Sequence, residues 1–193
     1  MTEKLTPQNP TDKTPPEGEN VIKEVVQTII LALFLSFGIR TFVAEARYIP
    51  SSSMEPTLQI NDKLIIEKMT YRFRTPKREE IIVFNATEAL QKEGFNSAFI
   101  KRVIGIPGDE VMVKDRVVTV NGKVVEEDYI KEAPSYNFGP VVVPPDNYLV
   151  LGDNRNNSYD SHMWGYVPKD KIVGRALVRF WPPNRLGVID SAE

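Results

Sequence analysis

The sequence predicts a mainly β protein: an antiparallel β-sheet or barrel-like domain with one transmembrane helix in front of it. A long apolar run near the N-terminus indicates the helix. Beyond residue 50, short runs of β-branched and aromatic residues alternate with turn signals, which is typical of strands. No long amphipathic helix pattern competes with them, so a sandwich or a closed, barrel-like sheet is the expected architecture.

The N-terminal part divides into a polar tail and an apolar helix. Residues 1–20 hold four prolines among polar residues, and we expect a disordered tail. Residues 21–44 are the expected helix, because the stretch from Val25 to Ala44 would be about 30 Å long, the thickness of a hydrocarbon core. A buried core helix and a cleaved signal peptide are the alternatives, and the polar, acidic residues in front argue against the second. Basic residues flank the run almost evenly, so charge leaves its orientation open.

Residues 45–193 are expected to form one β domain. Turn signals at 107–109, 121–122 and 144–147 separate its strands, and the Asn121-Gly122 pair favours a type I′ hairpin. The segments predicted as strands are Leu64–Glu67, Ile81–Asn85, Ala98–Ile104, Val111–Lys114, Val117–Val120, Val124–Glu126, Tyr148–Leu151 and Ile172–Phe180.

Composition excludes several kinds of site. The chain has no cysteine, which rules out disulfides, thiolate metal sites and cysteine nucleophiles. It has one histidine, His162, so a serine triad would have to use that residue. A net charge of −2 and the absence of a basic stripe argue against a nucleic-acid partner.

Three adjacent serines, residues 51–53, lie between Pro50 and Pro56 directly after the apolar run. A turn rich in hydroxyls is one interpretation. The other is a nucleophile, because the two prolines restrict the backbone on both sides and would hold a serine in one place. A serine hydroxyl still needs a base to act at neutral pH.

Lys101 and Arg102 interrupt an apolar strand pattern and could supply that base. Neighbouring residues of a strand point to opposite faces, so each cation would have apolar neighbours. The two could instead protect an edge strand against aggregation. A lysine in apolar surroundings has a lowered pKa and can act as a general base, as in Ser-Lys dyads.

A third segment, residues 152–162, is dense in Asp and Asn. An EF-hand beginning at Asp153 would need Gly and Glu where Ser158 and Trp164 stand, so a calcium loop is rejected. A turn-rich loop with internal hydrogen bonds and a loop that orients an active-site base remain as alternatives.

Three blocks of this sequence occur in the order found in one family. They are Ser51-x-Ser53-Met54-x-Pro56-Thr57, Lys101-Arg102-x-x-Gly105-x-Pro107-Gly108-Asp109 and Gly152-Asp153-Asn154-Arg155-x-Asn157-Ser158-x-Asp160-Ser161. The chain resembles type I signal peptidase, a membrane-anchored serine protease that removes signal peptides from exported proteins. The resemblance covers about residues 25 to 181 and is closest to the branch of oxygenic phototrophs.

The resemblance implies a role for individual residues. Ser53 would be the nucleophile and Lys101 the general base. Ser51 and the Ser53 N–H would bind the oxyanion, Ser158 would orient the lysine, and Asp153 would pair with Arg102. The implied structural support is Arg102, Asp153 and Asp160, and the implied substrate-binding residues are Ile49, Pro50, Met54, Phe99 and Ile100.

One position departs from the family. Much of the family has an arginine two residues after the aspartate at position 160, and His162 stands there instead. This departure leaves the pairing of Asp160 open and makes His162 a rival candidate for the base.

The resemblance also implies the substrate and the location. Preproteins with small residues at positions −1 and −3 would bind as an extended strand, and the lipid bilayer would be the other partner, with no nucleic acid, metal or cofactor. The protein would cross the cytoplasmic or thylakoid membrane once, with its catalytic domain on the periplasmic or lumenal side. Tyr71, Phe73 and Trp181 could contact the membrane surface.

Two rival functions remain. One is a self-cleaving repressor-type protease with a similar dyad, which the apolar run and the absence of a helix-turn-helix pattern disfavour. The other is a membrane-tethered β module that binds peptides without cleaving them.

Overall fold

The structure, a computed structural model, describes residues 17–189. The described chain divides into two units, one ending at Ile39 and one beginning at Arg40. Most of the expected tail, residues 1–16, lies outside the described residues.

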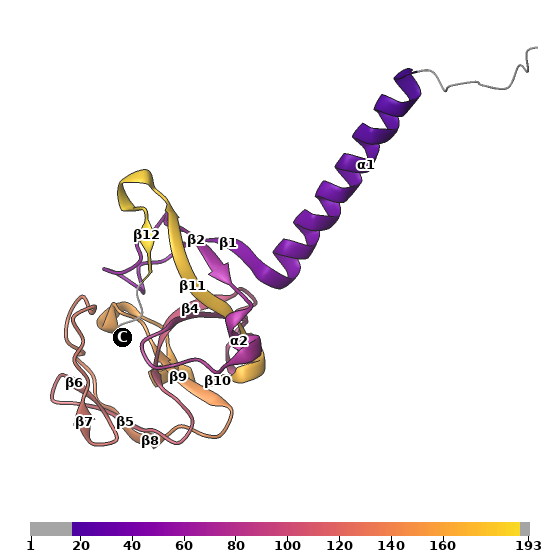
Figure 1. The fold of residues 1–193 in the computed structure, drawn as a ribbon. Coiled ribbons are helices and arrows are strands. Elements are labelled where there is room, and N and C mark those ends of the chain that lie inside the picture. The colour runs from indigo at the N-terminus through magenta and orange to yellow at the C-terminus, as the bar shows by residue number, and fades with distance from the viewer. Residues whose placement is uncertain (1–16, 190–193) are drawn as a thin grey trace, which may run out of the picture. The chain divides into compact units, whose positions relative to one another are not determined.

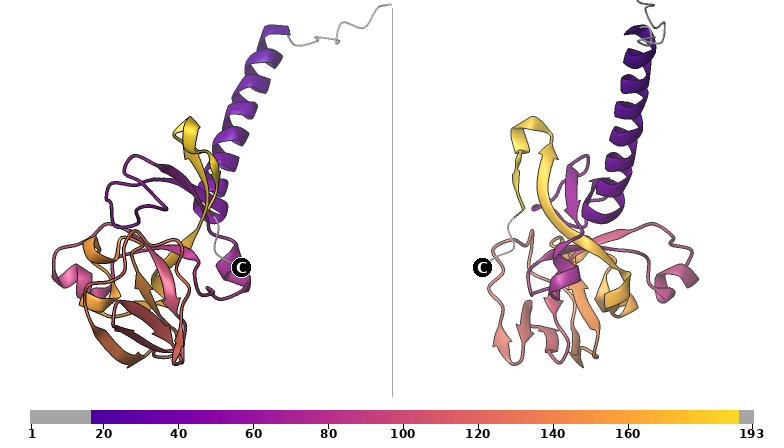
Figure 2. Two further views of the ribbon diagram at one scale, coloured as in Figure 1. Left: turned by 90° about the vertical axis from the view of Figure 1, so that its left-hand side faces the viewer. Right: turned by 45° about the vertical axis from the view of Figure 1, so that its right-hand side comes forward.

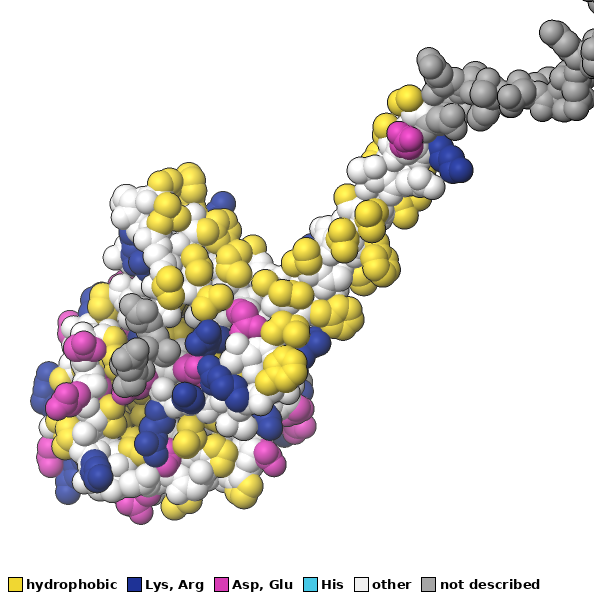
Figure 3. Space-filling view, in the orientation of Figure 1, with side chains coloured by type: hydrophobic (Ala, Val, Ile, Leu, Met, Phe, Trp, Pro, Cys, Tyr) yellow, Lys and Arg dark blue, Asp and Glu magenta, His cyan; other side chains and the backbone are white. Residues whose placement is uncertain are grey.

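The first unit is the helix α1 (Glu17–Gly38), which continues into the π-helical turn η1 (Ile39–Val43). The helix therefore begins within the segment expected to be a tail, and Ala44, the last residue of the expected helix, already belongs to a strand. The segment Val21–Val43 is long and apolar enough to span a membrane, with a mean hydropathy of 1.8 and none of its window buried. Apolar side chains make up much of the visible face of α1, with acidic and basic side chains near its N-terminal end (Figure 3).

The second unit is built of antiparallel strands, which confirms the predicted mainly β class (Figure 1). The strands are β1 (Ala44–Tyr48), β2 (Lys63–Glu67), β3 (Ile81–Phe84), β4 (Phe99–Gly105), β5 (Glu110–Lys114), β6 (Val117–Val120), β7 (Lys123–Val124), β8 (Phe138–Val142), β9 (Asn147–Leu151), β10 (Val167–Pro168), β11 (Ile172–Trp181) and β12 (Gly187–Val188). Short helices join them: α2 (Thr70–Phe73), α3 (Glu88–Lys92), α4 (Ser161–Trp164), and the 3₁₀ turns η2 (Arg155–Asn157), η3 (Lys169–Lys171) and η4 (Pro183–Arg185).

The strands form two sheets. The larger has the order β1-β2-β11-β3-β4-β9-β10, with β12 also paired to β11, and the smaller has the order β7-β6-β5-β8. The long β11 and its partner β12 form a hairpin that is visible from all three directions (Figures 1 and 2). Strand β4 lies between β3 and β9, so the interpretation of its two cations as protection for an edge strand is wrong.

Every segment predicted as a strand overlaps one, although Val124–Glu126 shares only Val124 with β7, and four strands were missed. Strand β1 (AEARY) does alternate, but it is short and begins at the last residue of the expected helix. Strand β8 contains Gly139-Pro140, and β10 and β12 have two residues each, so these three strands lack the alternation on which the prediction relied. At the predicted hairpin between β6 and β7, Asn121 and Gly122 have φ values of 54° and 74°. A type I′ turn requires positive φ at both positions.

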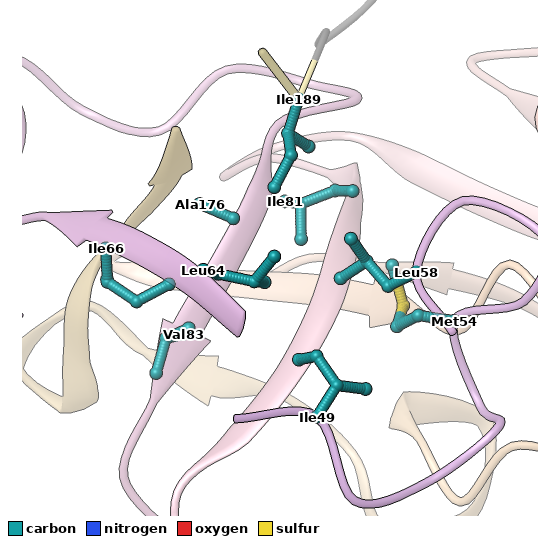
Figure 4. Packing of buried hydrophobic residues seen from close by; sticks show 9 residues of the cluster. All are labelled: Ile49, Met54, Leu58, Leu64, Ile66, Ile81, Val83, Ala176 and Ile189. Atoms are coloured by element: carbon teal, nitrogen blue, oxygen red, sulfur yellow. The ribbon is translucent and has the colours of Figure 1, made fainter. Parts of the chain in front are cut away.

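Three clusters of buried apolar residues fill the second unit. The first cluster draws on the segment after β1 and on β2, β3 and β11 (Figure 4). Its buried members are Ile49, Met54, Leu58, Leu64, Ile66, Ile81, Val83, Ala176 and Ile189. The second cluster includes Phe84, Val103 and Trp164, and the third includes Ile104, Val111 and Leu149. Because the first cluster contains Met54 and Leu58, the core holds the segment that carries the three serines.

Truncation of this core should be costly. Leu64→Ala removes a side chain with 0% exposure, so the free energy of unfolding should fall by about 2–5 kcal/mol. Urea denaturation in detergent, followed by tryptophan fluorescence, measures the change. Val124→Ala, at a position that is 62% exposed, is the matched control. Equal stability of the two variants would contradict the assigned core.

Candidate active site

The first segment of the site is the serine turn, residues 51–53, which follows β1. Next to it, Met54 and Leu58 are fully buried, and the Leu58 N–H donates to the Met54 carbonyl oxygen at 2.8 Å. Ser53 emerges beside this apolar anchor with 8% of its surface exposed, whereas Ser51 is exposed. The Oγ atoms of Ser51 and Ser53 lie 3.3 Å apart. The turn thus places the hydroxyls of Ser51 and Ser53 next to each other, and that of Ser53 is almost completely buried.

Lys101 reaches Ser53 from strand β4. Its Nζ donates to Ser53 Oγ at 2.7 Å and to the carbonyl oxygen of Ile100 at 3.0 Å, and the side chain is only 3% exposed. Burial lowers the pKa of Lys101 to about 8, because desolvation penalises the ammonium form, while the carboxylates of Asp160 and Asp153 oppose this shift. A buried amine that contacts a hydroxyl can accept its proton once the amine is neutral.

Arg102, the next residue of β4, is held by a buried ion pair with Asp153, the partner expected from the sequence. Its Nε and Nη2 donate to the two carboxylate oxygens at 2.8 Å and 2.6 Å, and neither residue exceeds 1% exposure. Arg102 also donates to the carbonyl oxygen of Glu79 and stacks on Tyr129, and Thr57 donates a third hydrogen bond to Asp153 at 2.6 Å. The arginine charge is therefore compensated within its own pocket.

The third segment is the loop after β9, and Gly152 allows it to approach the serine turn. A Cβ atom at this position would lie 2.2 Å from Ser158 Oγ and 2.4 Å from the Ser53 carbonyl oxygen. No side chain fits in that space, so the loop backbone can pack there only as glycine. This close approach explains why the third motif has a glycine at position 152.

Ser158 is placed differently from the prediction. Its Oγ is buried and, among the residues that the structure describes, has no hydrogen-bond partner. The predicted hydrogen bond to Lys101 is absent, and Nζ donates to Ser53 Oγ and to the Ile100 carbonyl oxygen. Ser158 lies against Gly152, at the back of the serine turn.

Asp160 is fully buried and is paired with the histidine that replaces the family's arginine. One carboxylate oxygen accepts the Gly152 N–H at 2.9 Å, and the other lies 2.7 Å from His162 Nδ1. The His162 ring stacks on Tyr136 with 4.1 Å between centroids. The hydrogen-bond partner of Ser53 is the lysine rather than this histidine, which leaves the rival base without a contact to the nucleophile.

Two cavities lie next to these groups. The larger, about 490 Å³, is bordered by Ser53 and Lys101, and the smaller, about 200 Å³, adjoins β1. Of the predicted substrate-binding residues, Pro50, Phe99 and Ile100 line both cavities.

The other two predicted substrate-binding residues differ. Ile49 lines the smaller cavity only, and Met54 lies inside the first core cluster with 0% exposure. The structure therefore assigns Met54 to the core, where its side chain packs in the first cluster and holds the adjoining serine turn.

Sequence reasoning missed two aromatic residues of the larger cavity, Phe95 and Tyr159. Their rings lie 5.7 Å apart, and Phe95 also contacts the Phe99 ring edge-on at 5.8 Å. Tyr159 lies within the third motif, and this position could have indicated that it belongs to the site. Within residues 17–189 no three His, Asp or Glu side chains are grouped closely enough to hold a metal ion.

Comparisons with known proteins agree with this architecture and site. The family described as "Signal peptidase, peptidase S26" matches residues 22–181. The chain is 60% identical to the probable signal peptidase I-2 of Synechocystis sp., over 100% of this chain and 88% of that protein. It is 57% identical to the signal peptidase I of Leptolyngbya laminosa, over 93% of each. It is 41% identical to the probable thylakoidal processing peptidase 2 of Arabidopsis thaliana, over 90% of this chain and 48% of that protein.

The family match covers most of the chain, from residue 22 to residue 181. It includes the apolar helix and the β domain in which a buried lysine contacts a serine. The chain belongs to the signal peptidase family, the S26 peptidases. Its relatives identify a type I signal peptidase of the branch found in oxygenic phototrophs, and the identification from the three motifs is confirmed.

The close approach at Gly152 predicts that an alanine will displace the serine turn. Gly152→Ala should lower the free energy of unfolding by about 1–3 kcal/mol and reduce turnover by about 100-fold, because small displacements of reacting groups are costly. Gly187→Ala, where an added Cβ meets nothing within 4 Å, is the control. Denaturation curves and cleavage rates measure both, and wild-type behaviour of Gly152→Ala would contradict the packing.

Proposed function

We propose that this enzyme cleaves N-terminal signal peptides from exported preproteins, with Ser53 as the nucleophile and Lys101 as the general base. The observation that carries the proposal is the 2.7 Å contact between Lys101 Nζ and Ser53 Oγ beside a cavity of about 490 Å³. No other pair of side chains among the described residues joins a serine to a buried amine at such a cavity.

Acylation begins when the neutral Lys101 amine takes the hydroxyl proton of Ser53. The Oγ atom bonds to the carbonyl carbon of the scissile peptide, and the carbonyl oxygen becomes an oxyanion. The Ser53 N–H and the hydroxyl of Ser51 stabilise this charge. The lysine ammonium then returns the proton to the leaving nitrogen as the peptide bond breaks, which releases the mature protein and leaves an ester on Ser53.

Deacylation repeats these steps with water. Lys101, neutral again, takes a proton from a water molecule, which attacks the ester carbon. The second oxyanion collapses, the proton passes to Ser53 Oγ, and the signal peptide departs with a new carboxylate. The ion pair of Arg102 with Asp153 and the packing of the third segment keep the geometry constant throughout.

Substrate selection follows from the two cavities. Alternate side chains of an extended peptide lie on one face about 7 Å apart, so the cavity beside Ser53 receives residue −1 and the cavity beside β1 receives residue −3. Pro50 and Ile100 form walls of both, and the small cavity of about 200 Å³ favours small side chains at −3.

The apolar segment Val21–Val43 anchors the enzyme in a cytoplasmic or thylakoid membrane, with the catalytic domain on the periplasmic or lumenal side. Its large apolar side chains are all at least 43% exposed, which supports a lipid environment for this segment. In the β domain, Phe73 and Trp181 are 82% and 48% exposed and would contact the membrane surface, whereas Tyr71 packs against the second core cluster.

Cleavage of a purified preprotein with an Ala-x-Ala site tests the proposal. Wild-type enzyme in detergent should produce a cut after that site, and Ser53→Ala should abolish it, because the nucleophile is removed. Ser135→Ala, whose hydroxyl donates to Asn156 and which does not line the cavity, is the control and should cleave normally. Mass spectrometry of the products gives the position of the cut.

Two results would count against the proposal. No cleavage by folded wild-type protein that still binds the preprotein would favour a peptide-binding module. Cleavage that survives Ser53→Ala would assign another nucleophile.

The pH dependence tests the base. Because the neutral amine is the active form and burial lowers the pKa of Lys101 to about 8, kcat/KM should rise as pH increases through about 8 and then level off. Lys101→Ala should lose activity by at least about 1,000-fold while remaining folded. His162→Gln should keep the rise with pH; a profile that disappears in His162→Gln and persists in Lys101→Ala would make the histidine the base.

A further inference from the structure

We infer that Asn154 is a positioning residue that aims the Ser53 N–H at the oxyanion. The inference rests on the proposed role of Ser53 and adds a residue whose side chain contacts neither the Ser53 hydroxyl nor the Lys101 amine.

Asn154 holds the carbonyl groups on both sides of the nucleophile. Its side-chain Nδ2 donates to the carbonyl oxygen of Ser52 at 3.1 Å, and its backbone N–H donates to the carbonyl oxygen of Ser53 at 3.1 Å. A carbonyl oxygen can only accept, so the nitrogen of the amide must face Ser52. Asn154 is only 7% exposed, and this burial shields both hydrogen bonds from water.

The contact with Ser52 determines the direction of the Ser53 N–H. Both groups belong to one planar trans peptide unit, in which the C=O and the N–H point in opposite directions. The Ser52 carbonyl oxygen also accepts the Glu55 N–H at 3.1 Å. With its two lone pairs occupied, this carbonyl fixes the rotation of the peptide plane, and the N–H is fixed with it.

The N–H that is fixed in this way is free for a substrate. Among residues 17–189, the Ser53 N–H donates to no acceptor, although Ser53 itself is 92% covered. A buried N–H without a partner is costly unless something else satisfies it. The residue borders the larger cavity, where a substrate oxygen would receive this hydrogen bond.

The chain around Asn154 keeps it in place. The Asn157 N–H donates to the Asn154 carbonyl oxygen at 2.9 Å, and Asn157 Nδ2 donates to Ser52 Oγ at 3.0 Å. Asn154 and Asn157 together therefore connect the loop after β9 to the serine turn. Asn156, between them, faces away: its Oδ1 accepts the Ser135 N–H at 2.7 Å, and its Nδ2 donates to the Ala133 carbonyl oxygen at 3.2 Å.

This arrangement gives a matched pair of variants. Asn154→Ala should lower kcat by about 10- to 100-fold and change KM by no more than about twofold, because the misdirected N–H matters only once the oxyanion forms. Asn156→Ala, which loses the same kind of amide from the same loop, should keep kcat within about twofold of wild type. Preprotein cleavage in detergent measures both.

Inhibition by a peptide aldehyde distinguishes a misdirected Ser53 N–H from a general loss of order in the active site. Ser53 Oγ adds to the aldehyde carbon while its proton passes to Lys101 Nζ, and the aldehyde oxygen, now singly bonded and negatively charged, takes the place of the oxyanion. Asn154→Ala should weaken inhibition by an aldehyde ending in Ala-x-Ala by the same factor as kcat falls. Binding of the product peptide, which contains no such oxygen, should stay unchanged. If Asn154→Ala does not fold, Asn154→Leu carries the test, because leucine has a similar size, adds no charge and lacks the donor.

Unchanged kcat in Asn154→Ala, or a loss of product-peptide binding equal to the loss of aldehyde binding, would overturn the inference. A parallel measurement on Ser53→Ala distinguishes this outcome from failure of the proposed function. An inactive Ser53→Ala with a fully active Asn154→Ala refutes the positioning role alone. An active Ser53→Ala refutes the assignment of the nucleophile.

Discussion

The site depends on keeping one amine out of water. A lysine side chain remains protonated when solvated, and only burial makes its neutral form accessible near neutral pH. Strand β4 provides this burial because it runs between β3 and β9 instead of along an edge. The same strand must also hold a guanidinium at the next position. Because neighbouring residues of a strand point to opposite faces, Lys101 and Arg102 are separated. Asp153 compensates the charge of Arg102, so β4 can hold a buried ion pair on one face and the buried Lys101 amine on the other.

The loop after β9 supports the serine turn at several points. Gly152 permits backbone contact, Asp153 fixes the charged neighbour of the base, and Asn154 fixes the carbonyls around the nucleophile. Asp160, from the end of the same loop, accepts the Gly152 N–H and pairs with His162. The Asp and Asn residues of this segment therefore form hydrogen bonds within the loop and between the loop and the serine turn.

The sequence was sufficient for the fold class, the apolar helix and most of the strands, because local periodicity carries that information. Motif spacing also singled out Ser53 and Lys101, which the structure brings into contact. It was insufficient wherever a side chain could turn in more than one direction. Met54 could line a pocket or fill the core, and Ser158 could face the lysine or the glycine. Asn154 could not be distinguished from Asn156 and Asn157, because the three differ only in contacts with distant parts of the chain. Asn154 and Asn157 reach Ser52, 102 and 105 positions away, whereas Asn156 reaches Ala133, 23 positions away.

Those long separations have a consequence for the biogenesis of the enzyme. The lysine lies 48 residues after the serine, and the asparagine that clamps the serine turn lies about another fifty beyond it. A nascent chain that has emerged only as far as β8 contains the serine and the lysine but lacks the brace that aligns them. The serine turn therefore gains its hydrogen bonds from Asn154 only after the chain has been synthesised as far as the loop after β9.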